Sequence, residues 1–297
     1  MRVFVTGASG FIGSAVVSEL IAAGHDVRGL ARSDSSAQAV EAAGAQVHRG
    51  DLENLDSLRA GAESADGVIH LAFNHDFTDY AGAAETDRRA IETLGEVLAG
   101  SDRPFVVTSG LVGFARGRTM TEDDAADPAF PRASEHTALL FASRGVRVSV
   151  LRLPPSVHGE GDHGFVPVLI DIAREKGVSA YPGDGSNRWP AVHRFDAARL
   201  FRMALESAPA GARLHAIGDD GVPVREIAGA IGRHLALPVS AVSPERAADH
   251  FGWLGAFFSL DVAASSALTR ELFEWRPTCP GLLDDLEQGH YFSDRAA

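Results

Sequence analysis

The residues with the clearest chemical potential form a glycine-rich turn at positions 6–13, with the sequence TGASGFIG. It follows the apolar run Val3–Val5 and opens the segment Phe11–Ala23, where Ile12, Val16 and Leu20 recur at helical spacing. Glycines in such a turn permit a tight bend, a close approach to a pyrophosphate and close packing of helix on strand. The free N–H groups and the dipole of the helix N-terminus favour the anion. We therefore expect a dinucleotide to contact Gly7, Ser9, Gly10, Phe11, Ile12 and Gly13.

The end of the next strand indicates which dinucleotide binds. The pattern predicts a strand over Val27–Ala31, and Arg32 and Ser33 follow it. An NAD site commonly has an acid at this position for the ribose 2′-OH, whereas an arginine suits the 2′-phosphate of NADP. Arg32 and Ser33 thus predict NADP, with NAD less favoured, although Asp34 lies close by. A solvated Arg32 without a ligand is the alternative.

Further segments are expected at the same site because each follows or ends a short apolar run. The predicted strand Val68–Ala72 would bring its end beneath the nicotinamide ribose, and Phe105–Thr108 is another predicted strand. The remaining expected cofactor contacts are Asp51, Leu52, Leu71, Ala72, Phe73, Thr108, Pro154 and Pro155.

Strand patterns alternate with helical patterns along most of the chain, which predicts a parallel sheet with helices on both faces. Further strands are expected at Val146–Leu151 and Leu214–Ile217, and helices at Thr86–Leu98 and Glu135–Ser143. The predicted fold is α/β, a Rossmann-type doubly wound parallel sheet with a small C-terminal substrate lobe. Residues 1–158 and 190–217 are assigned to the dinucleotide-binding domain, and residues 159–189 and 218–297 to the substrate lobe.

Composition excludes several classes of function. The 297-residue chain has a net charge of −13 and scattered arginines, which disfavours nucleic acid as a partner. No apolar run is long enough to span a membrane, and the first residues do not resemble a signal peptide, so a cytoplasmic protein is expected. The single Cys and the dispersed histidines indicate no metal site. We expect a small-molecule substrate and a monomer or homodimer.

Several motifs together resemble the extended short-chain dehydrogenase/reductase superfamily, which includes NAD-dependent epimerases and dehydratases. The resemblance implies a Rossmann fold, a nicotinamide cofactor and enzymatic activity. It is carried by residues 6–13, Asp51-Leu52, Leu71-Ala72, Leu151-Arg152, Val157-His158-Gly159, Val192-His193 with Asp196, and residues 272–277.

The superfamily's catalytic Tyr-x-x-x-Lys motif has no counterpart here. The only lysine is Lys176, and residue 172 is Ile. Counting back from Ser134-Glu135, which resembles the family's small-residue–Glu pair, puts Asp127 and Pro131 at the Tyr and Lys positions. Neither can exchange a proton as a tyrosine–lysine pair does.

Another group must therefore serve a reaction that moves a proton. His158 and Ser109 are the candidate catalytic residues, the first as an acid–base group and the second, beside Thr108, as a hydrogen-bond donor. His75, Tyr80 and His193 are candidate substrate-binding residues. A supporting, cofactor-contacting or solvated role is the alternative for each.

These features favour an NADP(H)-dependent oxidoreductase that reduces a small carbonyl or imine compound with a non-standard proton donor. A redox-silent NADP-binding sensor or regulatory protein is the alternative, because the loss of both the catalytic Tyr and the catalytic Lys agrees with a protein that binds the cofactor without turnover. A non-redox lyase or isomerase stays open as a third class.

Overall fold

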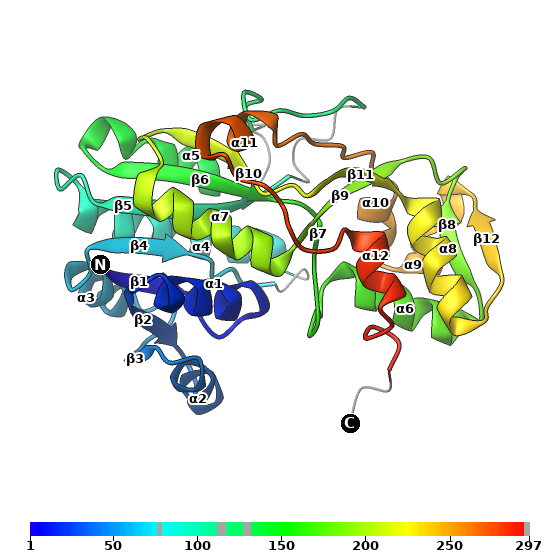
Figure 1. Cartoon of the computed structure of the whole chain (residues 1–297), viewed down its shortest axis with the longest axis horizontal. Coiled ribbons are helices and arrows are strands. Elements are labelled where there is room, and N and C mark those ends of the chain that lie inside the picture. The colour runs from blue at the N-terminus through cyan, green and yellow to red at the C-terminus, as the bar shows by residue number, and fades with distance from the viewer. Residues whose placement is uncertain (76–78, 112–116, 127–131, 294–297) are drawn as a thin grey trace. The chain divides into compact units, whose positions relative to one another are not determined.

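The computed structural model contains a seven-stranded sheet in the order β10-β6-β5-β4-β1-β2-β3 (Figure 1). The structure describes residues 1–75, 79–111, 117–126 and 132–293. The pairs from β3 through β2, β1 and β4 to β5 are parallel. The strands are β1 (Arg2–Thr6), β2 (Asp26–Ala31), β3 (Gln46–Arg49), β4 (Gly67–His70), β5 (Pro104–Gly110), β6 (Arg147–Leu153) and β10 (Ala212–His215). This is the predicted Rossmann-type arrangement, and the fold class is confirmed.

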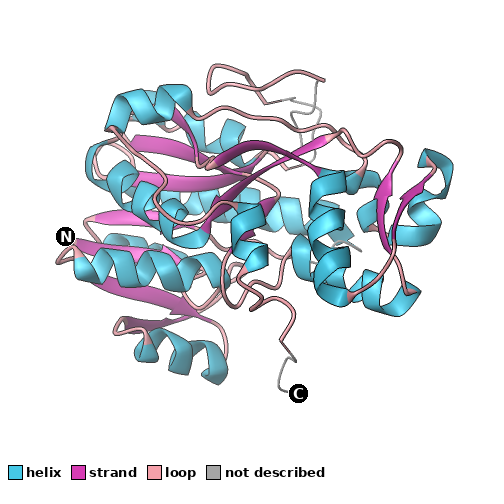
Figure 2. Ribbon diagram, turned by 45° about the vertical axis from the view of Figure 1, so that its right-hand side comes forward, coloured by secondary structure: helices cyan, strands magenta, loops and turns pink. Residues whose placement is uncertain are grey.

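Helices cover both faces of this sheet (Figure 2). With both faces covered, the central strands are apolar throughout, and Val3, Phe4 and Val5 of β1 are all buried. On one face a core joins Phe4 and Phe105 to Leu58 and Ile91 of the helices. The helices associated with the sheet are α1 (Phe11–Ala22), α2 (Asp34–Ala42), α3 (Leu55–Glu63), α4 (Tyr80–Leu98), α5 (Ser134–Leu139) and α7 (Arg194–Ser207), with a 3₁₀ turn at Ala142–Arg144.

The strand order reverses between β1 and β4, which pair in parallel with Thr6 opposite His70. In a doubly wound sheet the ligand binds in the crevice at the carboxyl ends of the strands at such a reversal. Thr6 and His70 both stand at those ends. The topology therefore places the glycine-rich turn and the end of β4 at the expected binding position.

The described residues group into two compact units. The first contains residues 1–109, 125–152 and 197–214, and the second residues 110–124, 153–196 and 215–297. The domain boundaries predicted from the sequence differ from these ranges and stay a prediction. That prediction assigned residues 190–193 to the dinucleotide-binding domain, and in the structure these residues lie in a sheet separate from the seven-stranded one.

The second unit contains two small sheets, in the orders β11-β9-β7 and β12-β8. Its core packs Trp189 and Phe258 with Leu169 and Ile231. The strands are β7 (Ser156–His158), β8 (Ser179–Pro182), β9 (Arg188–His193), β11 (Asp219–Pro223) and β12 (Val239–Val242). The helices are α6 (Phe165–Lys176), α8 (Val224–Leu235), α9 (Ala247–Phe251), α10 (Leu254–Phe258), α11 (Ala267–Phe273) and α12 (Leu282–Glu287), with a 3₁₀ turn at Pro244–Arg246.

Some predicted elements end at other residues. β4 stops at His70 because the N–H groups of Leu71 and Ala72 donate to Thr6 Oγ1. α4 begins at Tyr80 rather than Thr86, since Asp79 caps it by accepting from the Gly82 N–H. The predicted helix Glu135–Ser143 is divided, because α5 ends at Leu139. The predicted strand Leu214–Ile217 lies two residues earlier, at Ala212–His215.

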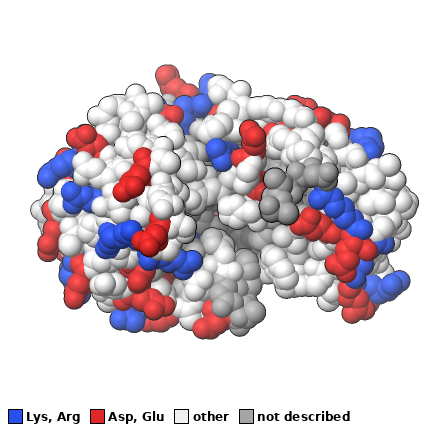
Figure 3. Space-filling model, turned by 90° about the horizontal axis from the view of Figure 1, so that it is seen from below, with Lys and Arg blue, Asp and Glu red and all other residues white. Residues whose placement is uncertain are grey.

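Within the described residues, no helix is both long and apolar enough to cross a bilayer. Figure 3 shows positive and negative side chains interspersed over the face in view.

Candidate functional site

The glycine-rich turn is shaped by two glycines whose replacement the backbone would not accommodate. Gly7 has a φ of +71°, and a Cβ there would lie 2.8 Å from the Ala72 nitrogen. A Cβ on Gly13 would lie 1.9 Å from the Gly7 carbonyl oxygen. Gly7 thus lets the chain leave β1 beside the end of β4, and Gly13 lets α1 pack directly against the turn.

The start of α1 keeps its anion-binding character. Gly10 is the cap and brings no side-chain hydrogen bond, and the first turn carries no acidic residue. Ser9 and Gly10 are exposed, whereas Phe11 and Ile12 are half-buried. This arrangement leaves the positive end of the helix dipole suited to a phosphate.

At the end of β2, the neighbours of Arg32 are engaged in local contacts. Asp34 forms an ion pair with Arg49, in which Asp34 Oδ1 lies 2.7 Å from Arg49 Nη2. The Ser33 hydroxyl caps α2 by accepting from the Ser36 N–H at 3.1 Å. Arg32 is exposed and makes no hydrogen bond or ion pair with another described residue. Its guanidinium therefore remains available to a ligand.

The Asp51 side chain stabilises the loop in which it lies. Its Oδ1 accepts the N–H groups of Glu53 at 2.9 Å and Asn54 at 2.8 Å, which makes a tight turn before α3. Leu52 beside it is half-buried. A cofactor contact by Asp51 and Leu52 stays a prediction.

A buried polar chain begins at the end of β1. Thr6 Oγ1 accepts two backbone N–H groups, from Leu71 and Ala72. Its own hydrogen is then directed to His70 Nδ1, 2.8 Å away, and His70 Nε2 in turn donates to Asp87 Oδ1 at 3.1 Å. Thr6, His70 and Asp87 are all essentially inaccessible to solvent.

This series of buried hydrogen bonds continues from Asp87 to Arg132. The Ser134 hydroxyl donates to Asp87 Oδ2 and accepts from Arg132 Nε at 2.9 Å. Burial disfavours the charged form of Asp87, but the hydrogen bond from His70 and the charge of Arg132 outweigh it, so its pKa lies below the usual value. The result is an ionised carboxylate that holds Arg132 through Ser134.

Arg132 is fixed at the carboxyl end of β5. Its Nη2 donates to the Thr108 carbonyl oxygen at 3.2 Å, and its Cζ lies 4.0 Å from the centre of the Phe73 ring. The side chain is only 16% exposed, yet its Nη1 donates to none of the described residues. The site thus contains an anchored cation with free donors.

The predicted residues on β5 lie in the same region. Thr108 and Ser109 are buried, and Thr108 Oγ1 has no hydrogen-bond partner among the described residues. An unpaired buried hydroxyl is costly unless a ligand or water satisfies it. Thr108 therefore fits a cofactor contact, and Ser109 stays a predicted catalytic residue.

Phe73 is the centre of an aromatic and charged group. His75 packs edge-on against its ring at 5.5 Å, and Tyr80 lies tilted at 6.0 Å, both between ring centres. His75 is exposed, whereas Tyr80 is half-buried as the first residue of α4. The structure therefore brings the predicted residues His75 and Tyr80, together with Arg132, around the ring of Phe73.

His158 and His193 belong to the second unit, with Pro154 and Pro155. His158 is fully buried in β7, where its Nδ1 lies 2.8 Å from Asp285 Oδ2. The His193 ring packs edge-on against it at 5.4 Å between ring centres. Burial, together with the neighbouring His158, lowers the pKa of His193. Pro154 is buried and Pro155 is half-buried, and the predicted roles of all four residues stay predictions.

Sequence reasoning missed Arg132, and the sequence contains one signal for it. Arg132 immediately follows Pro131, the position that aligns with the family's lysine. Asp127 and Pro131 lie outside the described residues. Across the described chain, no cluster of three or more His, Cys, Asp or Glu is arranged to hold a metal.

The fold and the site together define a dinucleotide-binding protein of the Rossmann class. The model of the NAD dependent epimerase/dehydratase family matches residues 3–217, and the chain belongs to this family.

Similar proteins agree with this membership. An uncharacterised protein of Schizosaccharomyces pombe is 52% identical over 98% of this chain and 100% of its own. A 4-hydroxy-2-methyl-3-oxo-4-farnesyl-3,4-dihydroquinoline-1-oxide ketoreductase of Stigmatella aurantiaca is 31% identical over 71% of this chain and 66% of its own. The crystal structure of dTDP-glucose 4,6-dehydratase from Streptomyces venezuelae matches with a TM-score of 0.77 and 23% identity, covering 98% of this chain and 96% of that one. That likeness concerns the fold.

Proposed function

We propose that this protein is an NADP(H)-dependent reductase of a small carbonyl or imine compound. The observation that carries the proposal is the set of uncommitted polar groups at the carboxyl ends of the strands. Among the described residues, Arg32 has no partner, Thr108 Oγ1 is buried without one, and Arg132 Nη1 donates to none. Buried polar groups are normally satisfied, so the Thr108 hydroxyl fits a polar ligand, and the two arginines offer charged donors beside it.

The residues present fit a dinucleotide. Gly7 and Gly13 remove the side chains that would block the turn, and the start of α1 would receive the pyrophosphate. Arg32 would bind a 2′-phosphate through charge-assisted hydrogen bonds, which favours NADP over NAD. Because Asp34 is paired with Arg49, its charge opposes that phosphate less than a free carboxylate would.

The reductase assignment follows from the groups near Phe73. The nicotinamide supplies a hydride when it is bound. Arg132 and Ser109 offer hydrogen-bond donors that would bind and polarise a carbonyl or imine, and Thr108 would hold the cofactor. The ketoreductase among the relatives supports this reaction class.

The proposal is tested by incubating the purified protein with NADPH and a panel of small aldehydes, ketones and imines. We expect stoichiometric loss of NADPH absorbance with at least one compound. NADPH binding without turnover of any panel member would favour the redox-silent sensor. Conversion of a compound without net NADPH consumption would favour a lyase or isomerase.

A further inference from the structure

Two side chains meet the ring of Phe73 from different parts of the first unit. Arg132 precedes α5 and lies over the ring, with its Cζ 4.0 Å from the ring centre. Tyr80 begins α4 and packs on the same ring at 6.0 Å between centres. A cation and a phenol are thus held close together at the carboxyl ends of β4 and β5. These two residue types can perform the work of the missing Tyr-x-x-x-Lys pair.

Arg132 is held in place by the structure around it. Nε is bound to Ser134, Nη2 to the Thr108 carbonyl, and Ser134 is bound to the buried Asp87. Asp87 Oδ2 also lies 4.0 Å from Arg132 Nε. Such a fixed guanidinium, whose Nη1 donates to none of the described residues, can stabilise negative charge on a bound oxygen without reorganising.

Tyr80 is better suited to proton donation than the other predicted groups. Ser109 is a weak acid, His158 is fully buried against Asp285, and His75 is exposed to solvent. The charged groups that act on Tyr80 are Arg132 and Asp87, and His75 shares its aromatic neighbour. Burial raises the pKa of Tyr80 and the Arg132 charge opposes that rise, so Arg132 eases formation of the phenolate.

We propose that Arg132 and Tyr80 form the catalytic pair of this site, a deepening that rests on the proposed reductase function. Arg132 binds the substrate oxygen through Nη1, and Tyr80 is its proton donor. As the carbonyl carbon gains a hydride from the reduced nicotinamide, the C=O double bond becomes a single bond and its electron pair moves to oxygen. The Tyr80 O–H bond breaks, its proton joins that oxygen, and the phenolate regains a proton from water.

The first test needs no turnover. The chain has three tyrosines, so the ultraviolet titration of Tyr80→Phe subtracted from that of the wild type isolates the ionisation of Tyr80. We expect Arg132→Gln to move that curve to higher pH and Arg132→Lys to restore it in part, with circular dichroism verifying the fold. Arg59→Gln, an exposed arginine paired with Asp56, is the control and should leave the curve in place. A Tyr80 curve unchanged by Arg132→Gln would overturn the pairing.

The second test uses a compound that the wild type reduces. Tyr80→Phe keeps the ring contact and removes only the hydroxyl, so kcat should fall by about 10²–10⁴-fold while the Kd for NADPH stays unchanged. Arg132→Gln should lower kcat/KM by about 10²–10³-fold, with partial rescue by Arg132→Lys. Tyr181→Phe in the second unit should match the wild type.

The possible failures are distinguishable. No turnover by the wild type across the panel would overturn the reductase proposal and this inference with it. Turnover by the wild type that Tyr80→Phe retains in full would overturn the catalytic pair alone and leave the reductase proposal standing.

Discussion

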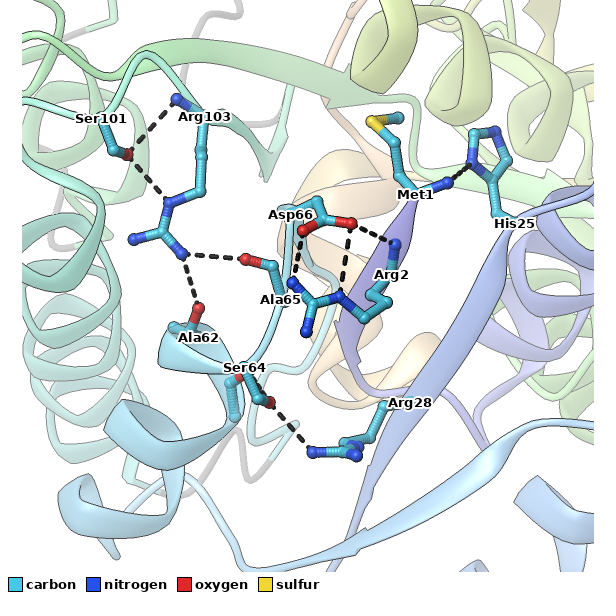
Figure 4. A network of polar contacts seen from close by, with 11 residues as sticks. Met1, Arg2, His25, Arg28, Ala62, Ser64, Ala65, Asp66, Ser101 and Arg103 are labelled. Carbon is cyan, nitrogen blue, oxygen red and sulfur yellow. Dashed lines mark hydrogen bonds and ion pairs between the residues drawn. The ribbon is translucent and has the colours of Figure 1, made fainter.

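The two edges of the seven-stranded sheet use their charged residues differently. At the edge where the strands begin, Arg2 pairs with Asp66 at 2.7 Å, and Arg28 donates to the Ser64 hydroxyl (Figure 4). Arg103 donates to three backbone carbonyl oxygens, those of Ala62, Ala65 and Val97. Each of these guanidinium groups is committed to the protein itself.

At the edge where the strands end, the polar groups are only partly committed. Within the part of the chain that the structure describes, Arg32 has no partner, and Arg132 is anchored through Nε and Nη2 while its Nη1 donates to no residue. Thr108 Oγ1 is buried and unsatisfied by the described residues. The charged groups at the first edge therefore stabilise the fold, whereas the described groups at the second edge keep hydrogen-bonding capacity that suits the proposed cofactor. Substitutions at the first edge should therefore change the free energy of unfolding and leave NADPH affinity unchanged, whereas substitutions at the second edge can change the affinity as well.

The largest effect is expected at the second edge from Gly13→Ala. The new Cβ would lie 1.9 Å from the Gly7 carbonyl oxygen, which is backbone and cannot move aside without shifting α1 or the turn. We expect a loss of about 3 kcal/mol in the free energy of unfolding. Dinucleotide binding should fall below detection by calorimetry. Gly229→Ala in α8, where the new Cβ would meet only the flexible end of the Arg233 side chain at 3.5 Å, is the matched control and should fold and bind normally.

An intermediate effect is expected from Asp87→Asn, which breaks the buried chain behind Arg132. The pKa of Asp87 is lowered in the folded protein, so its charge stabilises the fold above the unfolded value of about 3.9 and that contribution disappears as the pH falls below it. We expect a loss of about 2 kcal/mol at neutral pH, measured by denaturant unfolding. The difference from the wild type should shrink on acidification. A constant difference at all pH values would contradict an ionised Asp87.

The smallest effect is expected at the first edge from Asp66→Asn. The Arg2 guanidinium lowers the pKa of Asp66 to about 2, so the pair stabilises the fold above about pH 4 and loses that contribution as the pH falls towards 2. Because both side chains are largely exposed, the loss should be below about 1 kcal/mol and should shrink in high salt. NADPH affinity should be unchanged. A weakened affinity would show that the two edges are not functionally separate.

Local patterns in the sequence predicted the parts of this architecture that depend on nearby residues. Strand–helix alternation predicted the doubly wound sheet, and TGASGFIG predicted the turn after β1, because both signals act over a few residues. The cap by Ser33 and the turn at Asp51 also use neighbours two or three residues away, which made them accessible to sequence reasoning although they were not recognised.

The network around Arg132 was inaccessible for the opposite reason. It joins Thr6, His70, Asp87, Ser134 and Thr108, which come from five separate segments and meet only once the sheet and α4 have formed. No spacing rule links them. The same reasoning explains His158, whose burial against Asp285 depends on a contact 127 residues away along the chain.

The proposed binding of NADP at the second edge, through the turn and Arg32, can be measured by calorimetric titration with NADPH and NADH. We predict micromolar NADPH binding in the wild type and much weaker NADH binding. Arg32→Ala should weaken NADPH binding by about 10- to 100-fold and leave NADH binding unchanged, because only NADPH carries the 2′-phosphate. Arg59→Ala, which removes an exposed arginine paired with Asp56, should change neither affinity. Equal affinity for the two dinucleotides, or binding of neither, would contradict the account.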